Sequence, residues 1–393
     1  MKKILILSFY YQPDLCAGSF RCSALVDQLA AYQDLDITVV TTAPNRYASY
    51  ATAAPAYEQK NNLTVHRLSL PTHKSGLIDQ IKAFFSFYRQ ALRTVKGQKF
   101  DLVFATSSRL FTAFLGARVA NKLKAPLYLD IRDIFLDTIS DIFSVKKLLL
   151  IKPVIQAVEK YTFSSAKRIN LVSAGFAGYF KTRYPDTDYR WFTNGIDDEF
   201  VRENDLNAAR EPGLVRVLYA GNIGEGQGLH NILPELSVAM EGVASFTVIG
   251  DGGRKSILQD KLQGRTNVTV LPPVNREQLA LEYAKADVLF LHLNDYPAFE
   301  KVLPSKVFEY AASGKPIWAG VSGFAADFIT SEVENAAVFY PGDHLQAKQT
   351  FDTLKLNSVS RDSFVAKYLR RNIMKLMAQD IYQFCQSGIS KAK

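Results

Sequence analysis

Short apolar runs alternate with amphipathic stretches along most of the chain, and this alternation predicts strands separated by helices. In the first half, residues 3–9, 36–42, 62–70 and 100–107 are rich in Ile, Val, Leu and Phe and are typical of buried strands. Residues 77–96, between two of these runs, repeat apolar side chains at the spacing of a helix. Strands joined by helices in this way predict a parallel sheet covered by helices on its faces.

The same pattern restarts after a polar stretch at residues 201–213, which predicts a linker between two domains. A chain of 393 residues is too long for one compact core and suits two domains. We therefore expect two Rossmann-like, doubly wound α/β domains at residues 1–200 and 214–360, facing each other across a cleft. Residues 361–393 follow, with one long helix to about residue 384.

The charge of the chain is concentrated in its first half. Residues 1–200 contain 26 Lys and Arg against 17 Asp and Glu, while the remaining residues contain 21 of each, so the whole net charge of +9 lies before residue 201. An anionic surface or acceptor should therefore meet that half. Residues 77–96 place basic side chains opposite aromatic ones, which fits either docking on an anionic membrane or an ordinary helix with a solvated basic face.

Several function classes are disfavoured by what the sequence lacks. Three cysteines and five scattered histidines show no metal-ligand spacing, so no metal or other cofactor is expected. Gly18 stands alone where a dinucleotide fingerprint needs three glycines, which argues against a dehydrogenase. The N-terminal apolar run reads as a first strand and not as a signal peptide, and no run could span a bilayer, so a cytoplasmic protein without a nucleic-acid motif is expected.

Two clusters carry candidate chemistry. Asp130, Arg132 and Asp133 end a continuous apolar strand, and ligands of open parallel sheets gather at such strand ends. The alternative is a salt cluster at the end of a strand, but three charges in four residues favour function. The second cluster lies on a short helix predicted to start near Pro304.

Ser305 is the expected cap of that helix, and Gly314 its expected end. Lys306 and Glu309 are three residues apart, so they share one side of the helix. The ammonium group could meet phosphate while the carboxylate accepts hydrogen bonds from ribose hydroxyls. Taken alone, a surface ion pair explains the same spacing.

A series of motifs in a fixed order resembles the retaining glycosyltransferases of family 4, which have the two-Rossmann architecture called GT-B. The motifs are YxPxxxxG (11–18), DIRD (130–133), NGID (194–197), AGNIGEGQG (220–228), IGDG (249–252), YAKADV (283–288) and PSKVFEYAASGKP (304–316). They cover nearly the whole chain. The motifs DIRD, GNIG and PSKxFEY are similar to motifs of bacterial enzymes that build O-antigen or capsular polysaccharide, including L-fucosamine-type amino-sugar transferases. The C-terminal helix is expected to cross back to the first domain.

The resemblance implies roles for individual residues. Glu309 would bind the ribose hydroxyls, Lys306 the phosphates, and Asp130, Arg132 and Asp133 would face the acceptor hydroxyl, with Asp133, Lys306 and Asp130 as the catalytic candidates. The other candidates for donor binding are Gly18, Gly221, Asn222, Gly224, Gln227, Gly250, Asp251, Arg254, Lys301, Ser305 and Val307.

The chain departs from the family pattern where phosphate-binding cations are expected. Asn222 and Gln227 stand where many members have Arg and Lys, so Lys306, Lys301 and Arg254 are the candidates to supply positive charge. The family also pairs Glu309 with a second carboxylate eight residues earlier, and Lys301 occupies that position here.

The resemblance implies a retaining, metal-independent transfer of a sugar from a nucleotide-sugar donor, UDP-linked in our expectation, to a hydroxyl of a lipid-linked saccharide. An undecaprenyl-diphosphate-linked acceptor would place the enzyme peripherally at the cytoplasmic face of the inner membrane. A catalytically weak family member or a sugar-nucleotide-binding protein is the alternative. An epimerase would need the dinucleotide fingerprint, and a periplasmic-type binding protein would need an export signal; the sequence shows neither.

Overall fold

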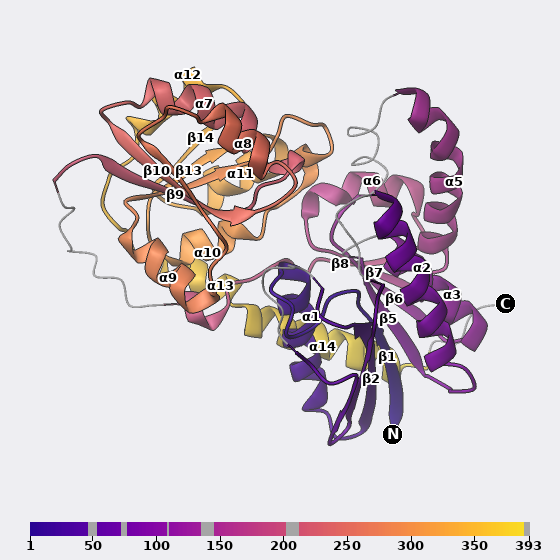
Figure 1. Ribbon diagram of the computed structural model, residues 1–393. Helices are drawn as coiled ribbons and strands as arrows, with labels where there is room; N and C mark the ends of the chain where they lie inside the picture. The colour runs from indigo at the N-terminus through magenta and orange to yellow at the C-terminus, as the bar shows by residue number, and fades with distance from the viewer. Residues whose placement is uncertain (46–52, 72–76, 108–109, 135–144, 202–211, 389–393) are drawn as a thin grey trace. The chain divides into compact units, whose positions relative to one another are not determined.

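The computed structural model describes residues 1–45, 53–71, 77–107, 110–134, 145–201 and 212–388, and most of the predicted linker lies outside them. The chain divides into two compact units (Figure 1). Unit 1 comprises Met1–Asn194 and Arg370–Lys393, and unit 2 comprises Gly195–Leu369. Each is an α/β unit built on a largely parallel sheet, which confirms the predicted fold class.

Unit 1 contains an eight-stranded sheet in the order β3-β4-β2-β1-β5-β6-β7-β8, parallel except for β3. Its strands are β1 (Lys2–Leu7), β2 (Leu35–Thr42), β3 (Tyr57–Lys60), β4 (Leu63–Leu68), β5 (Leu102–Ser107), β6 (Leu127–Ile131), β7 (Arg168–Leu171) and β8 (Asp188–Arg190). The central strands are buried on both faces, as continuous apolar runs require. All four residues of β3 are exposed, so no apolar pattern predicted this edge strand.

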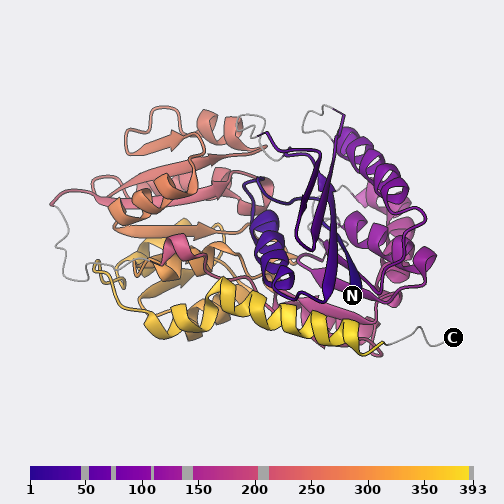
Figure 2. The same cartoon turned by 90° about the horizontal axis from the view of Figure 1, so that it is seen from below.

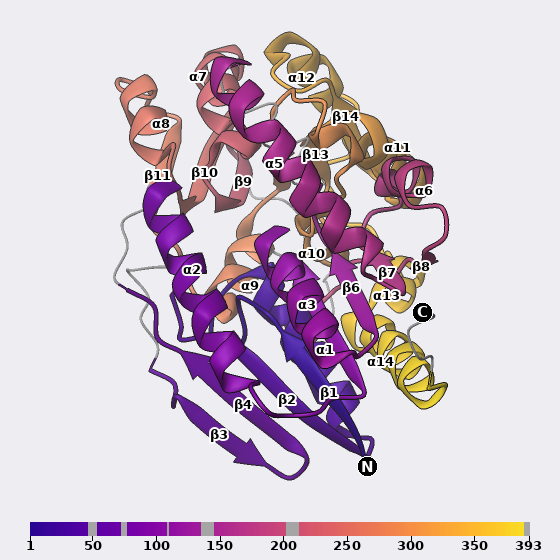
Figure 3. The ribbon, with the colours of Figure 1, turned by 90° about the vertical axis from the view of Figure 1, so that its right-hand side faces the viewer.

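Helices cover both faces of this sheet. They are α1 (Ala17–Ala30), α2 (Leu77–Thr94), α3 (Leu110–Leu123), α5 (Val145–Ser164), the short η1 (Ala174–Phe176), α6 (Ala177–Arg183) and α14 (Arg370–Gln386). Helices α2, α3 and α5 run side by side on one face (Figure 3), and α1 and α14 pack together on the other (Figure 2). Helix α1 begins at Ala17, so Gly18 lies buried in its first turn.

The predicted single helix from residue 361 to 384 is wrong. Helix α13 (Asp362–Tyr368) ends at Leu369, whose φ of −54° and ψ of 123° leave the helical region, and α14 starts at the next residue. Helix α14 then completes unit 1: the ring of Tyr382 stacks on that of Tyr32 at 4.3 Å. Asp380 of α14 accepts hydrogen bonds from Arg168 (2.9 Å) and Arg190 (2.8 Å).

Unit 2 contains a six-stranded, fully parallel sheet in the order β11-β10-β9-β12-β13-β14. Its strands are β9 (Val215–Asn222), β10 (Ala244–Asp251), β11 (Val268–Leu271), β12 (Val288–His292), β13 (Ile317–Gly320) and β14 (Ala336–Phe339). The chain moves outward from β9 in one direction and then returns to its other side at β12. Such a switch point opens a crevice at the carboxyl ends of the two strands, where ligands of this fold class bind.

The remaining elements of unit 2 are η2 (Asp198–Phe200), η3 (Glu225–Gln227), α7 (Leu229–Ala239), α8 (Lys255–Lys261), α9 (Arg276–Lys285), η4 (Phe299–Lys301), α10 (Lys306–Ala312), α11 (Gly323–Glu332), α12 (His344–Phe351) and α13. Trp318 centres the core on one face of the sheet and packs against the rings of Phe246, Phe290, Phe339 and Phe351. Within the described residues, no helix is long and apolar enough to cross a membrane.

Candidate functional site

Lys306 and Glu309, which the sequence predicts to bind the donor, lie at the start of α10 in unit 2, and we call this pair the donor clamp. Lys306 Nζ is 2.7 Å from Glu309 Oε2, which is the geometry predicted from their spacing. Tyr283 of α9 joins them: its hydroxyl donates to the same Oε2 (3.2 Å) and accepts from Lys306 Nζ (2.9 Å). Glu309 is buried, whereas 24% of the Lys306 side chain is exposed.

Both charged groups of the clamp keep hydrogen-bonding capacity for a ligand. An ammonium group has three N–H bonds, and two of those on Lys306 are donated to Tyr283 and Glu309. Among the described residues, Oε1 of Glu309 accepts no hydrogen bond, since both contacts are made by Oε2. One cationic donor and one carboxylate acceptor therefore remain available, a pair suited to phosphate and to hydroxyl groups.

Helix α10 is fixed relative to the central strand of the sheet. The backbone N–H of Ala220 in β9 donates to the hydroxyl of Tyr310 in α10 (3.1 Å). Arg361 holds the other end of α10, since its buried guanidinium donates to the carbonyl of Ala311 (3.1 Å) and to three further backbone carbonyls. Tyr310 follows Glu309 in the sequence and Ala220 precedes Gly221, so the bond between Ala220 and Tyr310 joins the clamp to the start of the glycine-rich loop.

The glycine-rich loop, residues 221–228, packs closely around Gly224 and Gly226, where an added Cβ would require neighbouring atoms to move. A Cβ on Gly224 would lie 2.3 Å from Nδ2 of Asn222, and one on Gly226 would lie 2.8 Å from the ring of Phe299. Gly228 takes a φ of +60° where the chain enters α7. Asn222 Nδ2 donates to Gln227 Oε1 (2.7 Å), so the two positions that lack the family's cations are bonded to each other.

Glu225 is a negative centre inside this loop. Its carboxylate accepts from Tyr296 (2.6 Å) and from Arg254 Nε (2.5 Å), and its backbone carbonyl accepts from Asn294 (3.1 Å). Burial opposes ionisation of Glu225, but the hydrogen bonds from Tyr296 and Arg254 outweigh it and hold its pKa below the usual value. Arg254, a candidate phosphate ligand, is therefore already paired through Nε.

His292, at the end of β12, ties the loop to the switch point. Its Nε2 accepts from the N–H of Gly342 (3.0 Å), so its Nδ1 carries the proton and donates to the carbonyl of Gln227 (2.7 Å). The side chain is fully buried, and burial lowers its pKa to about 4. The sequence offered no signal for this role because the partners of His292 are 65 and 50 residues away.

Some predicted donor residues have structural roles. Ser305 occupies the predicted N-cap position of α10, but it takes helical angles (φ −60°, ψ −25°) and its side chain makes no capping hydrogen bond. The side chain of Val307 is fully buried and its N–H donates to the carbonyl of Pro304 (3.1 Å). Gly250 pairs with Gly221 across β9 and β10, and Asp251, which accepts from the N–H of Gly252 (2.8 Å), ends β10 opposite Asn222. Lys301 lies in η4, outside α10.

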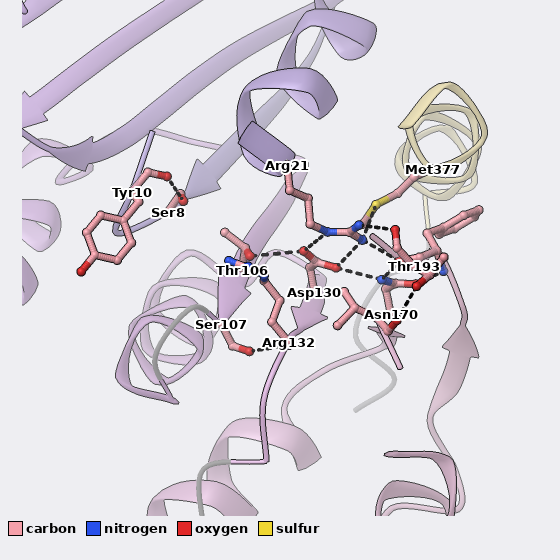
Figure 4. Close-up of polar contacts among 12 residues, drawn as sticks. Ser8, Tyr10, Arg21, Thr106, Ser107, Asp130, Arg132, Asn170, Thr193 and Met377 are labelled. Carbon is pink, nitrogen blue, oxygen red and sulfur yellow. Dashed lines mark hydrogen bonds and ion pairs between the residues drawn. The ribbon is translucent and has the colours of Figure 1, made fainter. Parts of the chain in front are cut away.

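In unit 1, a buried polar network surrounds Asp130 (Figure 4). Arg21 of α1 donates to both of its carboxylate oxygens at 2.9 Å, and Asn170 of β7 donates to one of them at 2.8 Å. Burial alone would raise the pKa of Asp130, but Arg21 and Asn170 hold it below the usual value. Only 2% of its surface is exposed. Asp130 is thus buried and already bonded within unit 1, and the acceptor contact that the sequence suggested stays a prediction.

Arg132 and Asp133 continue the chain beyond β6. The N–H of Arg132 donates to Oγ of Ser107 at the end of β5 (3.1 Å), which joins two strand ends. Asp133 is exposed. Of the three charged residues predicted to face an acceptor, these two thus lie at the carboxyl edge of the sheet, while Asp130 lies inside it.

Comparison with known proteins agrees with this description. Two family models match in succession: "Glycosyl transferase 4-like domain" over residues 21–195 and "Glycosyl transferases group 1" over residues 202–370. A curated relative from Escherichia coli (strain K12), "Putative colanic acid biosynthesis glycosyl transferase WcaI", is 32% identical over 100 residues. That match spans 25% of this chain and 24% of the relative, about a quarter of each.

Solved structures share the fold over the whole chain. Sucrose-phosphate synthase from Thermosynechococcus elongatus has a TM-score of 0.75 at 15% identity, covering 98% of this chain and 100% of its own. HepE from Anabaena, solved in complex with UDP, has a TM-score of 0.65 at 15% identity, covering 98% and 100%. WaaG, a glycosyltransferase involved in lipopolysaccharide biosynthesis, has a TM-score of 0.60 at 14% identity, covering all of both chains. Two glycosyltransferase family models therefore match the chain in succession, and the chain shares the fold of solved glycosyltransferases along its whole length.

Proposed function

We propose that this glycosyltransferase moves a sugar, with retention of anomeric configuration, from a UDP-sugar to a hydroxyl of a lipid-linked saccharide in O-antigen or capsular polysaccharide biosynthesis. The observation that carries the proposal is the donor clamp beside the glycine-rich loop, at the carboxyl edge of the parallel sheet of unit 2. HepE, which was solved with UDP, and WaaG, involved in lipopolysaccharide biosynthesis, support the choice of donor and pathway.

The clamp accounts for recognition of a nucleoside diphosphate. Oε1 of Glu309 accepts hydrogen bonds from ribose hydroxyls, and the remaining N–H of Lys306 donates to phosphate. Backbone N–H groups of the glycine-rich loop and the Nη atoms of Arg254 add donors for the diphosphate. Lys306 and these donors replace the two missing family cations and require no metal ion.

We assign to this site the chemical step that the family resemblance implies. The bond from the anomeric carbon to the diphosphate oxygen breaks, the acceptor oxygen bonds to the same face of that carbon, and the acceptor proton passes to a diphosphate oxygen. Negative charge grows on the diphosphate in the transition state, and Lys306 stabilises it by a few kcal/mol, as a fixed donor typically does. Asp133, exposed at the end of β6, is the carboxylate that we assign to the acceptor hydroxyl, with Arg132 beside it.

The helical layer α2–α3–α5 of unit 1 supports an anionic membrane as the partner surface. Its exposed cations are Lys82, Arg89 and Arg93 on α2, Arg118 and Lys122 on α3, and Lys152 and Lys160 on α5. Phe85 and Val154, 60% and 64% exposed, stand among them. Among the described side chains of these helices no carboxylate is exposed, since Glu159 is buried and accepts from Tyr179 (2.5 Å). Basic and apolar side chains on one face fit acidic phospholipid at the cytoplasmic face of the inner membrane.

Calorimetric titration of the full chain with UDP, GDP, ADP and dTDP tests the donor assignment. We expect UDP to bind and Glu309→Gln to weaken it about tenfold, the effect of losing a charged acceptor. Glu282→Gln, on the surface of α9, is the matched control and should bind normally. Absence of binding by all four nucleotides would falsify the proposal. A transfer assay with UDP-sugars then separates an active enzyme from a catalytically weak family member.

Flotation with vesicles tests the membrane partner. The chain should float with vesicles containing anionic phospholipid and not with neutral ones, and Arg89→Glu on α2 should reduce flotation. Lys375→Glu, an equal charge reversal on the exposed side of α14, should leave it unchanged. Equal binding to both kinds of vesicle, or to neither, would refute a charge-driven membrane contact.

A further inference from the structure

We propose that Tyr283 is the positioning residue of the donor clamp and that Phe200 holds Tyr283 in place. This inference rests on the proposed function, because it assigns to the clamp the recognition of ribose and phosphate. It also gives roles to two sequence motifs that the reaction leaves unused, the NGID segment before Phe200 and the YAKADV segment that begins at Tyr283.

The hydroxyl of Tyr283 orients both members of the clamp at once. A phenol has one proton to donate, and here it goes to Glu309 Oε2 at 3.2 Å, while the oxygen accepts from Lys306 Nζ at 2.9 Å. With Oε2 held by two donors, Oε1 is the oxygen left to face a ligand. Burial, followed by the nearby Glu309 charge, raises the pKa of Tyr283 well above its usual value, so the hydroxyl keeps its proton.

Aromatic rings hold Tyr283 on two sides. The ring of Phe200 stacks on it at 5.6 Å with 30° between the planes, and the ring of Tyr310 meets it edge-on at 5.3 Å and 90°. Only 2% of Tyr283 is exposed. A side chain packed in this way has one rotamer available, so its hydroxyl is a fixed point against which the flexible Lys306 can be oriented.

Phe200 is fixed in turn by Arg276, the first residue of α9. The guanidinium carbon of Arg276 lies 5.0 Å from the centre of the Phe200 ring, and its nitrogens pair with Asp197 (2.5 Å) and Glu199 (2.8 Å). Arg276 and Tyr283 are seven residues apart and therefore share one face of α9. Two side chains of α9, Arg276 and Tyr283, thus contact the segment Asp197–Phe200 and hold it against the helix.

The expected effect on ligand binding distinguishes positioning from simple support of the fold. Tyr283→Phe keeps the ring stack but removes the hydroxyl. Lys306 and Glu309 then keep their ion pair but lose the hydrogen bonds to Tyr283 that orient both side chains. Glu309 is then free to turn either oxygen toward Lys306, and its selectivity for ribose hydroxyls falls. A general loss of stability would instead lower the affinity for all ligands by the same factor.

The experiment compares two probes on the full chain: UDP and a UDP analogue whose sugar lacks both ribose hydroxyls. We expect the wild-type protein to prefer UDP by about tenfold or more, and Tyr283→Phe to reduce that preference about fivefold. Phe200→Leu should reduce it in the same direction. The matched control is Tyr189→Phe in unit 1, which also removes a buried hydroxyl, bonded there to the carbonyls of Tyr184 and Phe180, and should leave the preference unchanged.

Each other outcome is decisive. A Tyr283→Phe protein whose two affinities are unchanged, or fall by the same factor, overturns the inference and leaves the proposed function standing. If Tyr283→Phe fails to fold, an unchanged preference in Phe200→Leu overturns it instead. A wild-type protein that binds neither probe overturns the proposed function and this inference with it.

Discussion

Arg21 and Asp130 are 109 residues apart in the sequence and form a two-point ion pair inside unit 1, with Nε to Oδ2 and Nη2 to Oδ1 both at 2.9 Å. The same guanidinium donates to the carbonyls of Phe192 and Thr193, at 2.7 and 2.6 Å. One side chain of α1 thereby fixes the end of β6 and the last residues of the first segment of unit 1.

Replacing Asp130 with Asn should lower the free energy of unfolding by roughly 3–5 kcal/mol, because Arg21 is left buried without its counter-charge. Urea denaturation measures this. Asp101→Asn is the control, since its pair with Lys2 is more than a third exposed on both sides and should contribute less than about 1 kcal/mol. Equal effects of the two substitutions would contradict the structural role of the network.

Lys306→Ala should reduce turnover at saturating donor about a hundredfold, as the removal of one transition-state donor typically does. The thermal midpoint should fall, because buried Glu309 loses its counter-charge and keeps only its bond from Tyr283. Turnover is therefore measured at a temperature at which the variant is folded. Lys285→Ala, on the exposed side of α9, should retain full activity. A Lys306→Ala enzyme with near wild-type turnover would show that the leaving diphosphate is stabilised elsewhere.

Gly250→Ala should destabilise unit 2 by at least about 2 kcal/mol, since the new methyl group would lie 1.9 Å from the carbonyl oxygen of Gly221 and the two strands would have to separate. Gly253→Ala, three residues later, meets no atom within 4 Å and should change stability by less than about 0.5 kcal/mol. Denaturation of the two variants, followed by the fluorescence of Trp191 in unit 1 and Trp318 in unit 2, compares them directly. The idea fails if both are equally stable.

Stability should fall as the pH is lowered from about 6.5 to about 4, in part through His292. The pKa of His292 is about 4 in the folded protein and 6.5 in the unfolded chain, so between these pH values the unfolded chain binds a proton that the folded protein does not bind. The contribution is complete above pH 6.5 and its loss amounts to roughly 3 kcal/mol. Burial also lowers the pKa of His230, which adds to the same trend.

Urea denaturation of His292→Asn between pH 7.5 and 4 isolates this contribution. The substitution should reduce the slope of the free energy of unfolding against pH by the contribution of one proton. His344→Gln, at the partly exposed start of α12, should leave that slope as in the wild type. An unchanged slope in His292→Asn would mean that other groups account for the whole effect.

Much of the fold followed from local pattern. The apolar runs of β1, β2 and β5 were recognisable because strands buried on both faces need continuous apolar sequence. The exposed edge strand β3 and the break at Leu369 were not, because Tyr57 is the single apolar residue of β3 and no Gly or Pro marks the break.

In the candidate site, too, some features could be predicted from local sequence and others could not. Lys306 and Glu309 could be paired from the sequence because a helix brings residues three apart onto one side. The roles of Tyr283, Arg21 and His292 depend on partners brought close by packing alone, 26, 109 and 65 residues away. A tyrosine in YAKADV and an arginine in an amphipathic helix look like ordinary core and surface residues until those partners are known.

The position of α14 affects how the chain folds while it is being translated. Unit 1 is made of the first and last segments of the chain, and Met377 of α14 lies 3.5 Å from Arg21, inside the polar network. On the ribosome, the uninterrupted unit 2 can therefore reach its native state before unit 1, although unit 1 emerges first. Until α14 is released, the surface of α1 that it covers stays open to solvent. Chaperones that recognise uncovered apolar helices should act on this stage of synthesis, and premature termination before residue 370 should leave a folded second half attached to an unfinished first half.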